Sequence, residues 1–353
     1  MSGNSPRPLQ LGVMGCGNIA RQFVAAVAAS PHVKVTAAAS RDVAKAAAFA
    51  ETFGVMRHYG SYEALLSDAA LDIIYVALPN SMHVEWVVKA AQGGKHVLSE
   101  KPLALTLAEA NTMFATASAN KVMLLEAYPY WFQPQTRDML QLIGSGAIGE
   151  VRNVQASFGF NLLRSPDVQN NIRMKPDVGG GALLDAGSYA MSLIRLAMGD
   201  APERVMAHAT LADSGVDIAT SATLLYSGGR SAQLFCAMNI GYHRMATILG
   251  TDGVIETEFL NHTSNDPNHP LKYLPSLMRV RRGFAGTIPL QEVRSASGSG
   301  FAFSAEAFAT LIHAQDFAAM ERAARASCDI AATLEAIAKS VNSGHMVAVS
   351  GVR

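Results

Sequence analysis

Short apolar runs alternate with segments of helical periodicity through the first third of the chain. The apolar runs contain few polar positions, as is typical of strands that are buried on both faces of a parallel sheet. We predict strands at residues 9–13, 33–39, 73–77, 96–100 and 122–125. After the first of them, apolar residues recur three or four positions apart, as in Ile19, Phe23 and Val27. This order of strand and helix predicts an α/β domain with a parallel sheet.

The pattern changes near residue 151, where β-rich runs separated by glycine-containing turns predict a largely antiparallel sheet. The runs are residues 151–160, 204–211, 219–226, 231–240 and 245–250. We also expect a helix from the glycines at 179–181 to Met198, a loop at 261–270, and helices at 301–320 and 329–341. The chain therefore divides into an N-terminal domain, residues 1–127, and a C-terminal α+β domain with an open sheet, residues 128–353. The last helices could pack back on the first domain.

The composition narrows the class of partner. Half of the residues are hydrophobic, and 28 basic residues balance 28 acidic ones, so no overall field would hold nucleic acid or an anionic membrane. The three cysteines are far apart, and His262 and His269 lack further ligands, so we expect no disulfide framework and no metal site. The first eight residues are polar, and no apolar run is as long as a membrane span. We expect a cytoplasmic protein with a small-molecule partner.

A glycine turn joins the first predicted strand to the first helix. Gly15 allows a tight turn, Gly17 lets the backbone approach a pyrophosphate, and the small Ala20 lets helix and strand pack closely. Backbone N–H groups at the start of the helix would then face the phosphates. The alternative is a turn that merely connects two elements. We predict a Rossmann-type dinucleotide site that includes Gly15, Cys16, Gly17, Asn18 and Ile19.

The end of the second strand predicts which dinucleotide is bound. An NAD site usually has an acidic residue there, whereas this chain has Ser40 and Arg41, with Lys45 one turn later. Because arginine can pair with a 2′-phosphate through two N–H groups, we predict NADP(H). The alternative is a helix start with ordinary surface charges, in which Asp42 is the N-cap.

Two further strand ends should lie beside the cofactor, because ligands of open parallel sheets bind at the carboxyl ends of the strands. The residues after the strand at 73–77 give the candidates Ala77, Leu78, Asn80 and His83. His83 could equally be a capping or buried structural histidine. The strand at 96–100 runs into Glu100, Lys101 and Pro102. Taken alone, Glu100 and Lys101 could be a solvated ion pair.

Candidate substrate residues follow. Aromatic residues stand directly after the fifth strand, and Tyr128 and Trp131 could form walls of a pocket or belong to the core. In the helix toward Met198, Asp185 and Tyr189 are four apart and share a face that is more polar than the rest. The substrate candidates are Tyr128, Trp131, Phe160, Asp185 and Tyr189.

Together these motifs resemble the family of glucose–fructose oxidoreductase and inositol dehydrogenase. The resemblance covers essentially the whole chain, in order. It rests on Gly15-x-Gly17-x-x-Ala20, Pro79-Asn80-x-x-His83, Glu100-Lys101-Pro102, Glu126-Ala127, and Gly179-Gly180-Gly181 followed by Asp185 and Tyr189. The tyrosine is similar to that of the branch with glucose–fructose oxidoreductase and dimeric dihydrodiol dehydrogenase, whereas members like inositol dehydrogenase carry a histidine.

The resemblance implies hydride transfer between NADP(H) and C1 of an aldose or related sugar. No residue decides whether NADP(H) is tightly bound or dissociates between turnovers. It implies that Lys101 and Tyr189 are the acid–base pair with Asp185 as an orienting group, that the Lys101–Pro102 bond is cis, and that the open sheet forms a homo-oligomer. Trp131 and Gln133 replace an arginine and a histidine of other members, so the substrate could differ. The alternatives are a dihydrodiol or dicarbonyl oxidoreductase and a dinucleotide-sensing regulatory protein without turnover.

Overall fold

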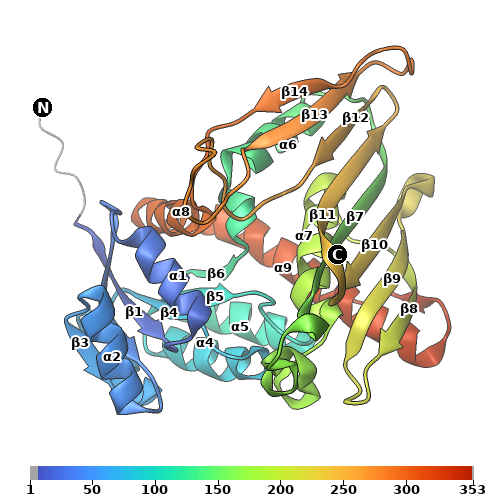
Figure 1. Cartoon of the computed structure of the whole chain (residues 1–353). Coiled ribbons are helices and arrows are strands. Elements are labelled where there is room, and N and C mark those ends of the chain that lie inside the picture. Colours follow the sequence, from blue (N-terminus) through green and yellow to red (C-terminus); the bar gives the residue numbers. More distant parts are fainter. Residues whose placement is uncertain (1–6, 352–353) are drawn as a thin grey trace, which may run out of the picture. The chain divides into compact units, whose positions relative to one another are not determined.

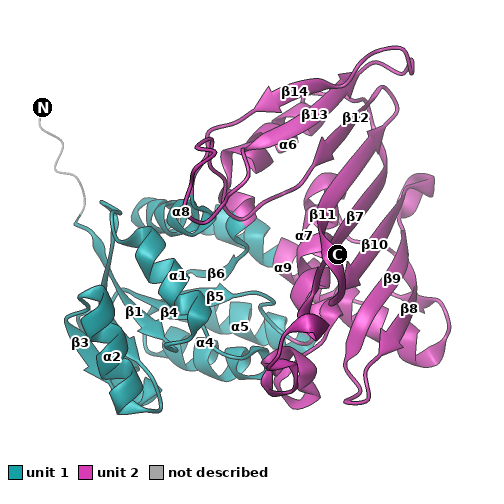
Figure 2. Ribbon diagram, viewed as in Figure 1, with its two compact units in different colours: residues 1–104, 108–129, 299–325 teal, residues 105–107, 130–298, 326–353 magenta. Residues whose placement is uncertain are grey.

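The computed structural model describes residues 7–351, so the first six residues of the polar N-terminal segment lie outside it. The chain forms two compact units (Figure 2). Unit 1 contains residues up to 104, 108–129 and 299–325, and unit 2 contains residues 105–107, 130–298 and 326 onward. Each unit is built around its own sheet.

Unit 1 has a parallel sheet of six strands, in the order β3-β2-β1-β4-β5-β6 (Figure 1). The strands are β1 (Leu9–Met14), β2 (Val33–Ala39), β3 (Arg57–Tyr59), β4 (Ile73–Val76), β5 (His96–Glu100) and β6 (Leu124–Ala127). β4 is buried at all four positions, as its continuous apolar sequence predicts. The order of the strands reverses between β1 and β4, which is where doubly wound folds bind their ligands.

The helices that accompany this sheet are α1 (Asn18–Val27), α2 (Val43–Phe53), α3 (Tyr62–Leu66), α4 (His83–Gln92), α5 (Leu107–Ala119) and α8 (Gly300–Ala314). Short 3₁₀ turns lie at Asn80–Met82 and Pro129–Phe132. The ring of Phe23 in α1 stacks on Tyr75 of β4 with 3.9 Å between centroids, and Phe301 of α8 meets Phe23 edge-on at 5.8 Å. These aromatic contacts join α8, from the last part of the sequence, to the core of unit 1.

Unit 2 contains a nine-stranded sheet in the order β14-β13-β12-β11-β7-β10-β9-β8-β15. Its strands are β7 (Val151–Asn161), β8 (Arg204–Leu211), β9 (Asp217–Leu225), β10 (Ser231–Ala237), β11 (Asn239–Gly250), β12 (Gly253–Thr257), β13 (Leu277–Arg282), β14 (Gln291–Arg294) and β15 (Val347–Ala348). Neighbouring strands are antiparallel except for β7 and β10. The predicted fold class, a parallel α/β domain followed by a mostly antiparallel open sheet, is confirmed.

The longer helices outside the first sheet are α6 (Pro134–Gly144), α7 (Ser188–Met198) and α9 (Phe317–Ser343), and a π-helix (Leu183–Gly187) leads into α7. Short 3₁₀ turns lie at Leu162–Arg164, Val168–Asn170, Ile172–Met174, Pro176–Val178 and Ser227–Gly229. Nε of Arg195 in α7 donates to Asp329 of α9 at 2.6 Å, and both side chains are buried. Because a buried charge is costly without its partner, this ion pair ties the two helices together.

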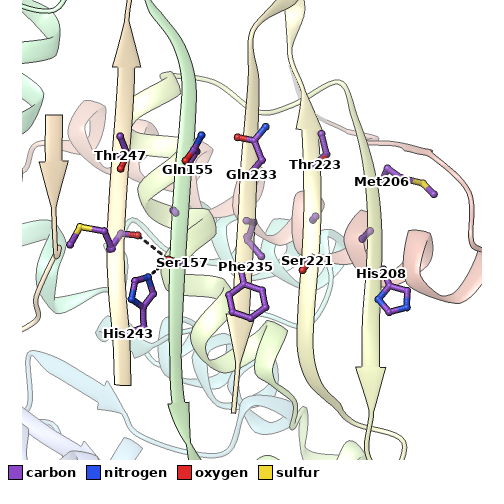
Figure 3. A pocket seen from close by; sticks show the side chains of 15 residues that line it. Gln155, Ser157, Met206, His208, Ser221, Thr223, Gln233, Phe235, His243 and Thr247 are labelled. Carbon is purple, nitrogen blue, oxygen red and sulfur yellow. Dashed lines mark hydrogen bonds between the residues drawn. The ribbon is translucent and has the colours of Figure 1, made fainter. Parts of the chain in front are cut away.

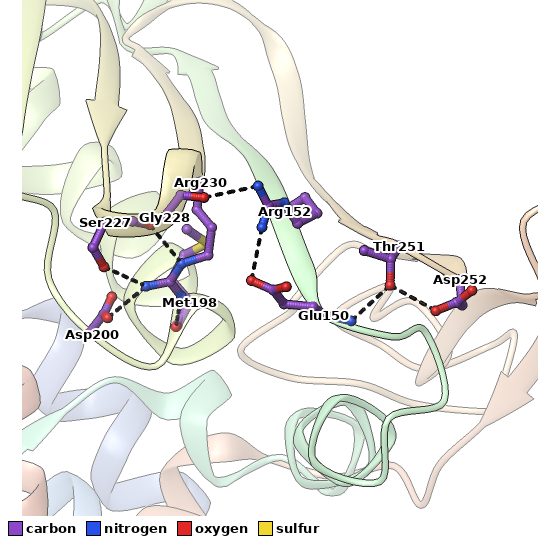
Figure 4. Close-up of polar contacts among 9 residues, drawn as sticks. All are labelled: Glu150, Arg152, Met198, Asp200, Ser227, Gly228, Arg230, Thr251 and Asp252. Atoms are coloured by element: carbon purple, nitrogen blue, oxygen red, sulfur yellow. Dashed lines mark hydrogen bonds and ion pairs between the residues drawn. The ribbon is translucent and has the colours of Figure 1, made fainter.

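Two arginines hold the turn between β9 and β10, at one end of this sheet (Figure 4). Arg230 pairs with Asp200 at 2.9 Å and donates to the carbonyl of Met198, so the β9–β10 turn is fixed to the end of α7. Arg152 donates to Gly228 of the same turn at 3.0 Å and pairs with Glu150.

The structure corrects three predicted elements. Residues 231–240 are not one strand, because the chain turns at Met238 between β10 and β11, which flank β7 on opposite sides. The carbonyl of Met238 accepts from the N–H of Leu162, directly after β7, at 2.9 Å. The helix expected at 301–320 ends at Ala314, since Gln315 adopts a left-handed conformation and Asp316 caps the next helix through the N–H of Ala319. α9 then runs unbroken to Ser343, where a separate helix at 329–341 was expected.

Candidate active site

Gly15 forms the turn after β1, and its backbone has a φ of +100° that side chains rarely adopt. A Cβ there would lie 2.5 Å from the carbonyl oxygen of Ala77, after β4. The glycine is therefore required by the fold itself. Next to it, Cys16 is buried and its Sγ donates to the carbonyl of Ala39, at the end of β2. Burial raises the pKa of this thiol, and the charges of Lys45 and Arg21 oppose that shift.

Gly17 differs from Gly15, because a Cβ at Gly17 would meet no atom within 4 Å. Its backbone is extended, and it precedes α1 without contributing a capping side chain. Asn18 is exposed and Ile19 is partly exposed at the start of this helix. A turn whose surface is left open by a missing side chain, next to a helix start, fits the pyrophosphate of a dinucleotide.

The end of β2 gathers the residues predicted to select the cofactor. The carboxylate of Asp42 accepts from the N–H groups of Ala44 and Lys45, so Asp42 is the N-cap of α2. Ser40 is buried and accepts from the N–H of Asp42, whereas Arg41 is exposed. Burial raises the pKa of Tyr62, and the charge of nearby Arg41 acts in the opposite direction.

His83 lies at the start of α4 and is fully buried. Its Nδ1 lies 2.9 Å from the carbonyl oxygen of Pro102, and its Nε2 lies 2.9 Å from that of Leu78. Burial lowers the pKa of His83, so the ring is neutral at pH 7 and can donate one N–H to one of these carbonyls. His83 thus joins the segments that follow β4 and β5, which is the structural role considered for it.

Glu100, Lys101 and Pro102 lie at the carboxyl end of β5, as the sequence predicts. Glu100 ends β5 and is buried, and its carboxylate accepts from the hydroxyl of Tyr75 at 2.5 Å and from the N–H of Lys101 at 3.3 Å. The Lys101–Pro102 peptide bond is cis, as predicted. Glu100 is therefore a buried, hydrogen-bonded group.

Unit 1 brings the predicted cofactor residues to one edge of its sheet. β2, β1, β4 and β5 are neighbours and run in the same direction, so the residues after them lie side by side. That edge carries Gly15, Cys16, Gly17, Asn18, Ile19, Ser40, Arg41, Lys45, Ala77, Leu78, Asn80, His83, Glu100 and Lys101.

The predicted substrate residues lie mostly in unit 2. Tyr128, in unit 1, is fully buried, whereas Trp131 is partly exposed and donates its indole N–H to the hydroxyl of Tyr130 at 2.9 Å. Gln133 is buried and donates to the carbonyls of Asn261 and Gly298. Its side chain thus supports a loop of unit 2, at the position where the resemblance leads one to expect a histidine.

Tyr189 is the second residue of α7, and its side chain points to a cluster of polar and aromatic groups within unit 2. Its hydroxyl accepts from Nδ2 of Asn261 at 3.0 Å. Phe158 of β7 meets its ring edge-on, with 5.6 Å between centroids, and the guanidinium carbon of Arg244 lies 4.6 Å from its ring centre. Sequence reasoning missed Asn261 and Arg244.

Asp185 lies in the π-helix before α7 and pairs with Arg173, whose Nε donates to Oδ2 at 2.6 Å. Arg173 is another residue that the sequence did not single out, and its guanidinium lies 5.9 Å from the ring centre of Phe160. The glycines at 179–181 allow the loop that carries Arg173 to approach the π-helix that carries Asp185 closely. A Cβ on Gly180 would lie 2.6 Å from the carbonyl oxygen of Arg173, and the N–H of Gly181 donates to that carbonyl.

Residues 7–351 contain neither a cluster of metal ligands nor a helix that could span a membrane. No group of three or more His, Cys, Asp and Glu side chains there could hold a metal ion. Over the same range, no helix has the length and apolar character needed to cross a membrane.

Comparison with known proteins shows to which family the chain belongs. A family model described as "Oxidoreductase family, NAD-binding Rossmann fold" matches residues 9–128, and the GFO/IDH/MocA C-terminal domain matches residues 136–256. D-xylose 1-dehydrogenase (NADP(+)) 2 of Haloferax volcanii is 40% identical over 253 residues, which span 70% of this chain and 75% of that protein. Trans-1,2-dihydrobenzene-1,2-diol dehydrogenase of Xenopus tropicalis is 36% identical over 248 residues, 69% of this chain and 74% of the other.

Among solved structures, a 3-ketoreductase from Actinomadura kijaniata in complex with NADP and TDP-benzene has a TM-score of 0.83 at 30% identity, and the match covers 95% of this chain and 98% of that one. The fold and these matches define the chain as an NAD(P)-dependent oxidoreductase. It belongs to the GFO/IDH/MocA oxidoreductase family, as the motifs predicted. Its relatives act on different substrates, as their names state: xylose, a dihydrodiol and a dTDP-sugar ketone.

Proposed function

We propose that this protein is an NADP-dependent oxidoreductase that transfers a hydride between the nicotinamide and C1 of an aldose or related sugar. Lys101 and Tyr189 are the acid–base pair. The observation that carries the proposal is the position of Lys101 directly after β5, at the sheet edge that also holds the Gly15–Gly17 turn. The name of the Haloferax volcanii relative, a D-xylose 1-dehydrogenase, supports an aldose and its C1.

Each side chain has a defined task in this proposal. The bound dinucleotide supplies or accepts the hydride. Tyr189 removes the proton from the substrate hydroxyl during oxidation and returns it during reduction. The ammonium of Lys101 stabilises the negative charge on the oxygen of the deprotonated Tyr189. Solved variants of the 3-ketoreductase include a tyrosine-to-phenylalanine and a lysine-to-alanine change.

We propose NADP(H) as the dinucleotide. Arg41 and Lys45 offer cations beside the buried hydroxyl of Ser40, while the nearby carboxylate of Asp42 is engaged in capping α2 and does not suit a ribose hydroxyl contact. The names of two relatives also contain NADP. Were the cofactor held tightly between turnovers, one sugar would be oxidised and a second reduced on the same protein.

The second candidate function is oxidation of a dihydrodiol or reduction of a dicarbonyl by the same residues. Aromatic groups favour it, because Trp131 replaces the arginine of other members and Phe160 lies near Arg173. The name of the Xenopus tropicalis relative points the same way. The third candidate is a sensor that binds NADP(H) without turnover, and we place it in the cytoplasm like the enzyme alternatives.

The test is a spectroscopic panel. Purified protein is mixed with NADP or NAD and with D-xylose, D-glucose or a trans-dihydrodiol, and reduced nicotinamide is followed by absorbance. Reduction of NADP by the aldoses supports the proposal. Reduction by the dihydrodiol alone supports the second candidate. Binding of NADP, seen by fluorescence, without turnover of any compound would favour the sensor and overturn the proposal.

We also propose that the protein is a homo-oligomer formed through the sheet of unit 2. Support comes from a hollow of about 740 Å³ on one face of that sheet, spread over β8, β9, β10, β7 and β11 (Figure 3). Its lining includes Gln155, Ser221, Thr223, Gln233 and Phe235 but no lysine, arginine, aspartate or glutamate. A broad face without charges is typical of the centre of a protein–protein interface, and a second copy of the same face would match it.

Sedimentation of the full chain tests this assembly. We expect a dimer or larger species that dissociates in the Ser221→Arg variant, because charges would be buried in the interface. The control is Lys339→Ser, which changes an exposed lysine on α9, outside the sheet. A monomer at micromolar concentration in the unmodified protein would contradict the proposal.

A further inference from the structure

Arg244 occupies an unusual position in β11. Its side chain is 7% exposed and shares the buried phase of the strand with Ala246 and Ile248. In the ladder it stands opposite Phe158 of β7. A strand places alternate residues on opposite faces, so an arginine in the apolar phase is directed into the interior of unit 2.

Four aromatic rings surround the guanidinium. Its central carbon lies 4.6 Å from the ring centres of Tyr189 and Phe259, 4.7 Å from that of Phe158 and 5.6 Å from that of Tyr130. Ring faces carry negative potential and attract a cation, most strongly where water is excluded. The rings thereby stabilise a charge that burial would otherwise disfavour.

No carboxylate neutralises this charge within the described part of the chain. Nη2 of Arg244 donates to Oδ1 of Asn261 at 3.1 Å, and Nε is buried without a hydrogen-bond partner. Burial lowers the pKa of Arg244, yet an arginine remains charged at neutral pH. Arg173 and Arg195 differ, since each is paired with an aspartate at 2.6 Å. The field of Arg244 therefore acts on its neighbours undiminished by a counter-ion.

Asn261 connects the guanidinium to Tyr189. Because arginine can only donate, the oxygen of the Asn261 amide must face Arg244, and this leaves the NH₂ group facing the tyrosine. Nδ2 then donates to the hydroxyl oxygen of Tyr189 at 3.0 Å. A cation at the amide oxygen polarises the amide and makes its N–H a stronger donor. The phenol oxygen of Tyr189 thus receives a hydrogen bond that strengthens when the oxygen is negatively charged.

We propose that Arg244 and Asn261 are positioning residues that orient Tyr189 and stabilise its deprotonated form. This inference rests on the proposed role of Tyr189 in proton transfer. Arg244 acts through the ring face and through Asn261, and it touches neither substrate nor cofactor in this scheme. The arrangement supplies stabilisation of the phenolate from within unit 2, in addition to what Lys101 provides.

Other titratable groups also face this cluster. Tyr130, before α6, and Arg173, from the loop before the glycines, interact electrostatically with Tyr189. Burial raises the pKa of Tyr130, so its hydroxyl keeps its proton. Tyr242 and His262 lie near Arg244, and burial together with the Arg244 charge lowers the pKa of His262 to about 4. Arg173 is compensated by Asp185. Arg244 is consequently the main source of uncompensated positive charge among these groups.

Two variants test the inference in the full chain. Arg244→Met removes the charge but keeps an unbranched side chain between the rings, and Asn261→Asp replaces the amide donor with an acceptor. Arg244→Lys retains the charge. Arg152→Met changes an exposed arginine on β7 and is the matched control. Circular dichroism first establishes which variants fold, and Asn261→Asp decides the question should Arg244→Met fail to fold.

The first readout is ionisation of Tyr189, followed as the tyrosinate absorbance difference between each protein and its counterpart with Tyr189→Phe. We expect the titration midpoint to rise by about one pH unit or more in Arg244→Met and Asn261→Asp, to be largely restored in Arg244→Lys, and to be unchanged in Arg152→Met. An unchanged midpoint in the folded Arg244→Met and Asn261→Asp proteins would overturn the inference.

The second readout is the pH dependence of kcat/KM for oxidation, whose acidic limb should move upward by the same amount. A shift in the tyrosinate titration without a shift in the kinetic profile would support the electrostatic role of Arg244 and Asn261 while contradicting Tyr189 as the proton-transfer group. The failure of the inference and the failure of the proposed function are thereby distinguished.

Discussion

The Nε atom of Arg173 donates a 2.6 Å hydrogen bond to the carboxylate of Asp185, which lies in the π-helix one turn before Tyr189. The Asp185 side chain is 17% exposed, and its charge is the main cause that raises the pKa of Arg173. The carboxylate that the sequence singled out for orienting the substrate is thus itself held by a cation from a preceding loop. π-Helical turns often occur at functional sites, which agrees with this position.

This ion pair predicts the behaviour of two variants. Asp185→Asn and Arg173→Ala should each lower kcat/KM by about tenfold or more, because the π-helix before Tyr189 loses its fixed geometry. If Asp185 acts by holding Arg173, the double variant will be no worse than either single one. Steady-state kinetics of all three proteins measure this, and a double variant with multiplied losses would indicate separate roles.

Removal of the Tyr189 hydroxyl should abolish most turnover. We expect Tyr189→Phe to lower kcat by about 100-fold or more, since general acid–base catalysis is lost, while NADP still binds in unit 1. Turnover is measured with the best substrate of the panel and binding by nicotinamide fluorescence. Tyr242→Phe, an exposed tyrosine on β11, is the control. Near-native turnover of Tyr189→Phe would refute the role.

The cofactor preference should depend on Arg41. Arg41→Ala is expected to raise the KM for NADP about tenfold or more and to leave the KM for NAD almost unchanged, because one charge-assisted contact to the 2′-phosphate is lost. Asp42→Ala is the neighbouring control. It removes the N-cap of α2, so it should cost about 1 kcal/mol of stability without changing the preference. Equal loss with both cofactors in Arg41→Ala would contradict the assignment.

Substitution of the two glycines of the dinucleotide turn should have different effects, one on stability and the other on NADP binding. Gly15→Ala forces a side chain into a left-handed backbone and against the carbonyl of Ala77, so we expect a loss of about 2 kcal/mol or more in unfolding free energy. Gly17→Ala places its methyl group in open space, so stability should be kept. We expect Gly17→Ala to weaken NADP binding by about tenfold or more, because the methyl group occupies the space through which the pyrophosphate approaches the backbone. Urea unfolding and fluorescence titration separate the two effects.

Stability should fall in mild acid, partly because of His262. Its pKa is about 4 in the folded protein and about 6.5 in an unfolded chain, so the unfolded state binds more protons between these values. The contribution of the neutral His262 to the free energy of unfolding is complete above pH 6.5 and is lost as the pH falls toward 4. Burial also lowers the pKa values of His83 and His96, which adds to the same trend. Unfolding free energies of His262→Gln should vary less with pH over this range than those of the unmodified protein.

The sequence by itself determined the elements whose signals are local. The apolar runs located β2 and β8 to the residue, the glycine turn marked the start of α1, and the family motifs identified Lys101, Asp185 and Tyr189 as candidates. Such patterns are readable because strand and helix periodicities depend on residues within a few positions of one another. Element ends that depend on a distant partner were missed, as at Met238, where the chain passes from one side of β7 to the other.

The tertiary structure alone decided which groups surround the candidate tyrosine. Arg244 and Asn261 are 55 and 72 positions from Tyr189 in the sequence, and the pairing of β11 with β7 brings the arginine against the tyrosine ring. The sequence does show Arg244 in phase with the apolar Ala246 and Ile248, but it does not show which residues Arg244 contacts. Contacts between distant segments depend on strand order and register, and these are fixed by packing of the whole unit, which no local pattern encodes.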